Sequence, residues 1–319
     1  MPIAITDEQE SMRQTIARWA ARTEPPQAVR GQEPTGRGAD WHDLADLGLY
    51  AIAVPEAAGG ADGSVVDLAA ALEACAEVLA GGPLLPTTLA SLLLAGTPAG
   101  DELLPKLAAG QVTVAVALPG ARAVQEGVVE VGPVLCAGQT THLLVPVGGR
   151  SWCLVETDHP SVELTPREPV DFSRGLAGVR LAVPPERCFE GPEPQRAREL
   201  AATLYAAEAA GVAAWCLRTA TGYAKLRQQF GRPIGSFQAV KHLCAGMLCR
   251  LERASAAAWD AARAVGGPEH PLAAAVAASI ALDAAVDDAK DCVQVLGGIG
   301  FTWEHDAHLY LRRALALRQ

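Results

Sequence analysis

The sequence predicts an α+β fold that is mainly α-helical. Half of the residues are hydrophobic, many of them alanine, and aromatic residues make up only 5%. Apolar residues recur at helical spacing before residue 112 and after about residue 193, while short β-branched runs fill the segment between them. We therefore expect an N-terminal helical domain over residues 1–111, a short antiparallel β-domain over 112–190, and a C-terminal helical domain of the four-helix type over 191–319.

Caps and breakers divide the N-terminal domain into helices. The segment ITDEQESMRQTIARWAART predicts an amphipathic helix that Thr6 or Asp7 caps and that Pro25 and Pro26 end. A short helix begins at WHDL and breaks near Gly48. Further helices are expected over Val65–Leu79, Thr87–Ala95 and Asp101–Ala109, and the segment GGPLLP at residues 81–86 separates the first two of these.

The remaining elements follow from the same signals. The runs VTVAVAL, GVVEVG, THLLVPV, SWCLVET, VELTP and VRLAVP are short, β-branched and bounded by Gly or Pro, as in strands. A long Ala-rich helix is then expected over Arg196–Arg227, followed by the loop QQFGRPIG. A second helix starts at Ser236 or Phe237, a third covers Leu272–Leu296, and EHDAHLYLRRALALRQ gives the last.

Composition excludes several classes of protein. The net charge of −10, with no basic tract, argues against nucleic-acid binding. Eight scattered cysteines without a CxxC pair predict reduced thiols. The polar N-terminus does not resemble a signal peptide, and no stretch predicts a membrane span, so we expect a cytoplasmic protein. His305 and His308 lack a third ligand cluster, so no metal site is expected.

Three segments carry a family resemblance. RQQFGRPIGSFQAVKH (227–242) and VQVLGGIGFTWEHDAHLYLRRA (293–314) resemble two signatures of the acyl-CoA dehydrogenase family, and DLADLGLYAIAVPEAAGG (43–60) resembles its N-terminal signature. They occur in the family's order and span nearly the whole chain. The resemblance implies a flavoenzyme that uses FAD to desaturate an acyl-CoA thioester between Cα and Cβ.

The resemblance also implies which residues contact FAD. In the family, the RxxFG loop of one subunit and the QxxGG segment of its neighbour close on one flavin. Carried over, the contact residues are Arg227, Gln229, Phe230, Ile234, Gln238, Gln294, Gly297 and Gly298. An arginine can neutralise a phosphate with paired donors, and glycines such as Gly231 and Gly235 let the backbone approach closely in a turn. For Gly297 and Gly298 an ordinary helix C-cap is the competing interpretation.

The catalytic base is harder to assign. Many family members carry it in a Glu-Gly-Thr that follows the LRRA-like segment, and this sequence stops at Gln319 before that position. Others carry it on the helix before the RxxFG loop, at a register that corresponds here to Ala201. Glu208 lies seven residues on, two turns along nearly the same face, and is our candidate base. Glu199 is the runner-up, and a buried structural carboxylate is the alternative for Glu208.

The β-domain departs from the family. The stretch VAVALPGARAVQEG (114–127) lacks the T-E-P-x-A-G-S-D-like sequence that contacts flavin and substrate, and the domain is short. The chain therefore resembles the compact actinobacterial subunits that pair with a longer homologue in α2β2 enzymes and desaturate steroid side-chain CoA esters.

Two other functions stay open. One is a non-catalytic subunit that completes a partner's flavin site, and the other is a homo-oligomeric desaturase of a carrier-protein-bound acyl group. The family's usual electron acceptor, an electron-transferring flavoprotein, is the implied redox partner, and no nucleic-acid, membrane or metal partner is expected.

Overall fold

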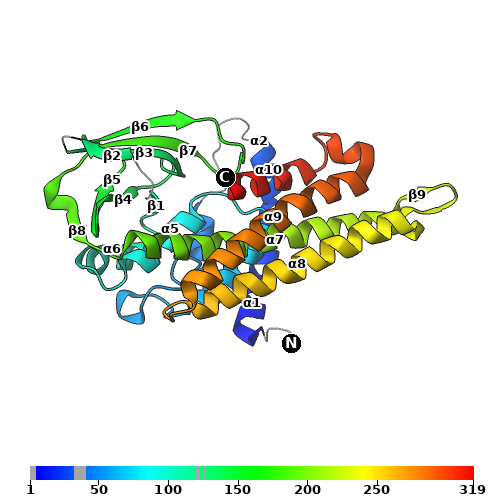
Figure 1. Ribbon diagram of the computed structural model, residues 1–319, viewed down its shortest axis with the longest axis horizontal. Coiled ribbons are helices and arrows are strands. Elements are labelled where there is room, and N and C mark those ends of the chain that lie inside the picture. The colour runs from blue at the N-terminus through cyan, green and yellow to red at the C-terminus, as the bar shows by residue number, and fades with distance from the viewer. Residues whose placement is uncertain (1–4, 32–40, 119–121, 126) are drawn as a thin grey trace. The chain divides into compact units, whose positions relative to one another are not determined.

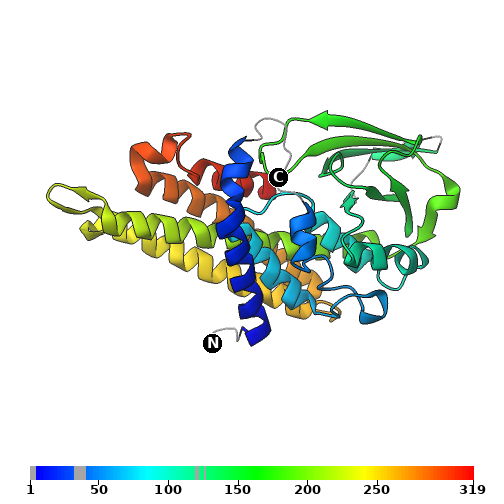
Figure 2. The same ribbon diagram turned by 180° about the vertical axis from the view of Figure 1, so that it is seen from behind.

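The computed structural model describes residues 5–31, 41–118, 122–125 and 127–319, so part of the departing stretch at 114–127 lies outside them. The chain forms two compact units. One comprises Met1–Pro26, Ala69–Ala80 and Ala202–Gln319, and the other comprises Gln27–Leu68 and Gly81–Ala201. Helices dominate and the sheets are small, which confirms the predicted fold class (Figures 1 and 2). The division into three sequential domains stays a prediction.

The first helix starts as its sequence predicts. In α1 (Asp7–Thr23), the Thr6 hydroxyl accepts from the Gln9 amide at 3.2 Å, and the Gln9 side chain accepts from the Thr6 amide at 3.1 Å. This reciprocal capping box satisfies two amides that would otherwise lack intrahelical partners. The predicted end at the prolines needs correction: α1 ends at Thr23 with Glu24, whose φ is 44°, as its C-cap, and Pro25 opens the next helix, α2 (Pro25–Gly31). Proline suits that first helical position.

The other helices of the N-terminal region are α3 (Trp41–Asp46), η1 (Glu56–Ala58), α4 (Val65–Glu77), α5 (Leu84–Leu94) and α6 (Pro98–Ala108). Gly48 has a φ of 74°, which explains the break after α3. Both α5 and α6 begin three residues before the predicted starts. Prolines do not prevent this, because the first turn of a helix does not need their missing amide protons.

Eight strands form two four-stranded sheets. One has the order β1-β4-β5-β8, with β1 (Val114–Val116), β4 (His142–Gly148), β5 (Ser151–Glu156) and β8 (Cys188–Glu190). The other has the order β2-β3-β7-β6, with β2 (Arg122–Gln125), β3 (Val128–Leu135), β7 (Leu176–Ala182) and β6 (Val162–Arg167), and η2 (Pro185–Arg187) precedes β8. The pairs are antiparallel as predicted, except that β1 runs parallel to β4.

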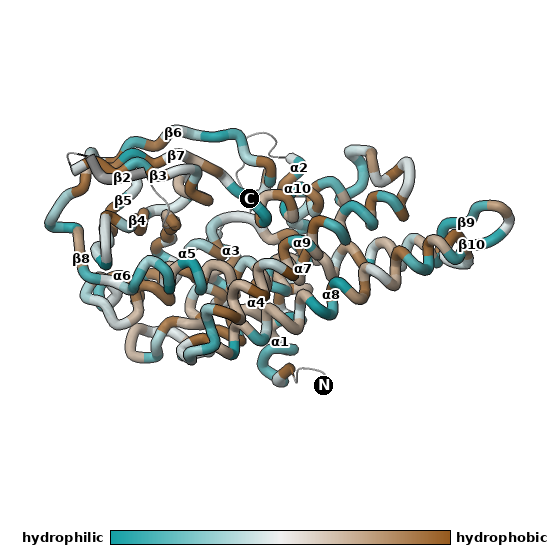
Figure 3. Tube along the Cα trace, viewed as in Figure 1, coloured by the Kyte–Doolittle hydropathy of each residue, from teal (hydrophilic) through white to brown (hydrophobic). Residues whose placement is uncertain are grey.

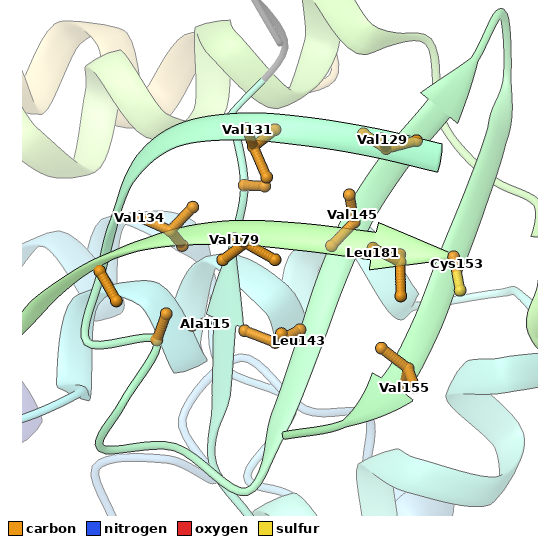
Figure 4. Close-up of a cluster of buried hydrophobic side chains, with 13 residues drawn as sticks. Ala115, Val129, Val131, Val134, Leu143, Val145, Cys153, Val155, Val179 and Leu181 are labelled. Atoms are coloured by element: carbon orange, nitrogen blue, oxygen red, sulfur yellow. The ribbon is translucent and has the colours of Figure 1, made fainter. Parts of the chain in front are cut away.

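The two sheets share one core. Inward side chains of β3 and β7, such as Val131 and Val179, point toward Leu143, Val145 and Val155 of the facing sheet (Figure 4). Period-two alternation places these side chains inside and the polar residues of β3 and β7 outside. Burial of this valine-rich layer is what holds the β-region together.

The C-terminal region consists of α7 (Pro194–Leu226), a hairpin of β9 (Gln228–Gln229) and β10 (Arg232–Pro233), η3 (Ile234–Ser236), α8 (Gln238–Ala264), α9 (His270–Leu296), η4 (Gly297–Phe301) and α10 (Ala307–Arg318). Pro271 lies in the first turn of α9, one residue before the predicted start of this helix. Helix α7 is long and apolar enough to cross a membrane, but 72% of its most apolar window is buried inside the structure. A helix in the core of a folded protein can be equally long and apolar.

Small residues let these helices approach closely. A Cβ on Gly211 of α7 would lie 2.1 Å from the Glu73 carbonyl oxygen of α4. Near this contact, Glu73 accepts from Arg13 of α1 and from the indole of Trp259 of α8, each at 2.9 Å. One carboxylate therefore links three helices of the unit.

Candidate functional site

The predicted cofactor loop is a tight β-hairpin at the end of α7. Arg232 pairs with Gln229, and Pro233 pairs with Gln228. Both residues of the two-residue turn have positive φ, 53° for Phe230 and 75° for Gly231, as a type I′ turn requires. The hairpin extends past the other helices of its unit, and hydrophobic residues interrupt its mainly hydrophilic surface (Figures 1 and 3).

Phe230 is strained and almost fully exposed. A left-handed backbone is costly for a bulky residue, and Asn or Gly normally takes this place in the turn. The ring is nevertheless 91% exposed. Its described ring contact is with Phe237, 6.0 Å away edge-to-face, and the Arg232 guanidinium lies 4.2 Å over Phe237. The contact with Phe237 leaves most of the ring exposed, and backbone strain at such an exposed residue is typical of functional sites.

The region around the hairpin is basic. Between Glu208 and Glu252 the chain has six Lys or Arg residues and no Asp or Glu, although the whole protein carries a charge of −10. Arg227 is exposed at the base of the hairpin, where its carbonyl accepts from the Ile234 amide at 2.8 Å. A Cβ on Gly235 would lie 2.9 Å from the Ala224 carbonyl oxygen, so this glycine allows the close approach predicted for it.

The second predicted segment ends α9. Gly297 has a φ of 63° and caps the helix, which gives its presence a structural reason. Gly298 differs, because its φ is not positive and a Cβ there would meet nothing within 4 Å. Gln294 and Gly298 are both exposed. Because Gly298 has no side chain and the described residues around it leave the space open, a ligand or another chain could approach its backbone.

The two segments share one end of a helix pair. Helices α8 and α9 are joined by the turn at residues 265–269 and pack against each other as a hairpin, as the ion pairs of Arg250 with Asp288 and Asp291 show. Gln238 at the start of α8 and Gln294 near the end of α9 therefore lie at the same end of this pair. Exposed apolar side chains flank these segments, including Leu226 and Phe301, which are 81% and 79% exposed.

Glu208 does not join this group. Helix α7 rises about 27 Å between Glu208 and Leu226, at 1.5 Å per residue. Glu208 is only 1% exposed and interacts with neighbouring groups. Trp215, two turns on along nearly the same face, stacks on Tyr310 of α10 with ring centroids 3.6 Å apart. The candidate base therefore lies inside the helical unit, far along the helix from the hairpin. The runner-up, Glu199, accepts from Gln195 at 3.1 Å in an exposed setting.

A buried ion cluster was missed in the sequence. Arg250 of α8 donates from Nε to Asp288 Oδ1 at 2.6 Å and from Nη2 to Asp291 of α9. Asp288 is fully buried, and burial raises its pKa to about 7 against the opposing effect of Arg250. A signal existed, because Asp288 falls on the same helix face as Ala281, Ala285 and Cys292, which are buried.

His305 and His308 make hydrogen bonds with residues close to them in sequence. His305 Nδ1 accepts from the Ala307 amide at 3.1 Å, and His308 Nδ1 lies 2.7 Å from the His305 carbonyl oxygen. Within the described ranges no group of three or more His, Cys, Asp or Glu is placed to hold a metal, and no disulfide is present.

Comparison with known proteins identifies the family. Residues 6–111 match the model described as "Acyl-CoA dehydrogenase, N-terminal domain", and residues 198–319 match "Acyl-CoA dehydrogenase, C-terminal domain". The acyl-CoA dehydrogenase IpdE2 of Mycobacterium tuberculosis is 36% identical over 97% of this chain and 91% of its own length. The acyl-CoA dehydrogenase FadE34 of the same organism is 46% identical over 98% of this chain, which spans only 46% of FadE34.

Solved structures with the same fold are similar to this chain over nearly its whole length. The ChsE4-ChsE5 complex from Mycobacterium tuberculosis matches with a TM-score of 0.89 and 25% identity over 99% of this chain and 94% of that one. A variant of the Tcur3481-Tcur3483 steroid ACAD matches with a TM-score of 0.85 and 28% identity over 97% of this chain and 91% of that one. With both domain models matched and a full-length relative above 30% identity, the chain belongs to the acyl-CoA dehydrogenase family of FAD-dependent oxidoreductases.

Proposed function

We propose that this chain is a subunit of a heteromeric, FAD-dependent enzyme that desaturates an acyl-CoA thioester between Cα and Cβ. The observation that carries the proposal is the strained, exposed Phe230 at the tip of a basic hairpin. When bound, FAD accepts a hydride from the acyl chain. The substrate class is a steroid side-chain CoA ester, for which the support is the similarity to the Tcur3481-Tcur3483 steroid ACAD.

The exposed residues fit the cofactor. The flavin dinucleotide has a pyrophosphate, which needs cations, and an adenine, which needs an aromatic or apolar face. Arg227 would pair with a phosphate through its planar guanidinium. Phe230 would supply a ring face, and Gln229, Gln238 and Gln294 would donate or accept hydrogen bonds. Ile234, Gly297 and Gly298 would line the site, and the absence of acids between Glu208 and Glu252 keeps repulsion from the phosphates low.

A second chain of the same family is the proposed partner. Leu226, Phe230 and Phe301 expose large apolar surfaces beside the cofactor segments, as a surface that meets another protein does. FadE34 matches this chain over only 46% of its length, which leaves room in one polypeptide for a second unit of comparable size. The ChsE4-ChsE5 complex, a structural match, contains two named proteins. The electrons of the reduced flavin would pass to an electron-transferring flavoprotein.

Glu208 is the proposed base within this chain. A carboxylate that takes the weakly acidic Cα proton works best where water is excluded, and Glu208 is buried. The same burial favours a second candidate function. If Glu208 only holds helices together, the chain is a non-catalytic subunit that contributes Arg227 and Phe230 to a site whose base belongs to the partner.

The test is flavin content. The chain is purified alone and after co-expression with a homologous family member, and the visible flavin spectrum and mass are measured. We expect flavin near stoichiometry in the heteromer and its loss in Arg227→Ala, with no loss in Arg253→Ala, an exposed arginine elsewhere on α8. A chain that binds flavin fully as a homo-oligomer, or an Arg227→Ala heteromer that keeps its flavin, would contradict the proposal.

A further inference from the structure

The cluster of Arg250, Asp288 and Asp291 joins α8 to the last turns of α9. Arg250 bonds both carboxylates at once, with Nε to Asp288 Oδ1 at 2.6 Å and Nη2 to Asp291. Asp291 precedes Gln294 by three residues, so the two side chains are neighbours on the helix surface. We propose that Arg250 is a positioning residue for the flavin site, holding the end of α9 so that Gln294 and Gly298 face the cofactor. This inference rests on the proposed function.

The charge distribution gives the first argument. The last three turns of α9 carry three acidic residues, Asp287, Asp288 and Asp291. They also lie within three turns of a segment that would meet a pyrophosphate. Lys290 lies 3.8 Å from Asp287 but on the same helix. Arg250 is the cation that comes from another helix to balance Asp288 and Asp291.

Burial gives the second argument. Asp288 is fully buried, and its Oδ2 has no hydrogen-bond partner among the residues that the structure describes. The bond from Arg250 to Oδ1 is therefore the compensation that the described contacts provide for this carboxylate. An exposed ion pair would be too weak to fix a helix end, but a buried carboxylate held by an arginine fork is much harder to release.

The fork adds a directed contact to a helix end that otherwise packs through apolar side chains such as Cys292 and Leu296, which are buried. Gly297 ends α9 with a positive φ, and Gly298 has no neighbour within 4 Å of its Cβ position. Small shifts of α9 along α8 would carry Gln294 and Gly298 with them. Sub-ångström displacement of binding groups is enough to weaken a ligand, so a fixed register between the two helices is a functional requirement.

The experiment compares variants in the assembled enzyme. Arg250→Met removes the fork, Arg250→Lys keeps the charge but loses the paired geometry, and Arg250→Met with Asp288→Asn also removes the buried charge. Arg253→Met, an exposed arginine one turn on, is the control. For each we measure the FAD dissociation constant at low and high salt, the flavin visible spectrum and the melting temperature without flavin.

The expected results separate positioning from stability. Arg250→Met should weaken FAD binding about tenfold, as loss of a charged hydrogen bond does. High salt should recover part of the affinity, because it screens Asp291 from the phosphates. The double variant should regain its melting temperature but not its FAD affinity, and Arg250→Lys should lie between wild type and Arg250→Met.

Two outcomes would overturn the inference. One is an Arg250→Met enzyme that keeps its FAD affinity within twofold of wild type, and the other is a double variant whose affinity returns together with its melting temperature, which would make the fork merely structural. A wild-type assembly that binds no flavin would instead overturn the proposed function, and this inference with it.

Discussion

Replacing Asp288 by Asn should change how stability depends on pH. The Asp288 carboxyl has an ordinary pKa of 3.8, and burial raises its pKa in the folded protein to about 7. Between these values the folded protein holds a proton that the unfolded chain has released. Stability therefore falls as pH rises through this window, the reverse of the usual behaviour of a salt-bridged aspartate. The variant has no proton to lose at this position.

The size of the effect follows from the shift. A change of roughly 3 pH units corresponds to about 4 kcal/mol at 1.36 kcal/mol per unit, which is an upper limit for this group. From pH 5 to pH 7, the free energy of unfolding of the wild type should fall by roughly 2–3 kcal/mol relative to Asp288→Asn. The neighbouring charges are Arg250, Asp287 and Asp291, with the Cys216 thiol also nearby.

Denaturation by urea, followed by tryptophan fluorescence at pH 5, 6, 7 and 8, gives the two free energies at each pH. Other titrating groups cancel in the difference between variant and wild type. A difference that stays constant from pH 5 to pH 8 would refute the reasoning, because it would mean that Arg250 keeps Asp288 ionised in the folded protein over the whole range.

Three further predictions concern the helices and the hairpin. Glu208→Gln should leave flavin content unchanged and abolish desaturation in the assembled enzyme, and retained turnover in a steady-state assay would remove Glu208 as the base. Gly211→Ala should lower the free energy of unfolding by about 1–3 kcal/mol, because its Cβ would strike the Glu73 carbonyl oxygen. The control Gly222→Ala, with open space around it on the same helix, should raise the free energy of unfolding by up to about 1 kcal/mol. Equal melting temperatures for the two variants would contradict both expectations. Phe230→Asn should relieve the turn and stabilise the protein by about 1 kcal/mol while weakening flavin binding, and a variant with unchanged flavin affinity would show that the exposed ring has no part in the site.

Local patterns in the sequence predicted the elements but not their partners. Thr6 predicted the start of α1, because an N-cap acts on amides only two or three residues away. The parallel pairing of β1 with β4 was not predicted, because pairing between strands depends on contacts far apart in sequence. For the same reason nothing local reveals that Glu73 meets Trp259, 186 residues away.

The candidate site shows the same limit. The hairpin could be located from glycines and signature residues, since its geometry is set within a few residues. The exposure and strained φ of Phe230 needed the structure. The Arg250 fork was missed because its residues lie on two helices, 38 and 41 residues apart in the chain. Glu208 was predicted as the candidate base, but its burial could not be derived from helix periodicity in a segment that is apolar on every side.

The division of the chain into units bears on how the protein is made. One unit is assembled from Met1–Pro26, Ala69–Ala80 and Ala202–Gln319. During synthesis, more than a hundred residues follow α1 and the end of α4 before α7 to α10 are made, and Glu73 cannot form its hydrogen bond with Trp259 until then. Such long-range contacts fold slowly and leave apolar helices uncovered in the meantime. Yield in a foreign host should therefore depend on chaperones and slow translation.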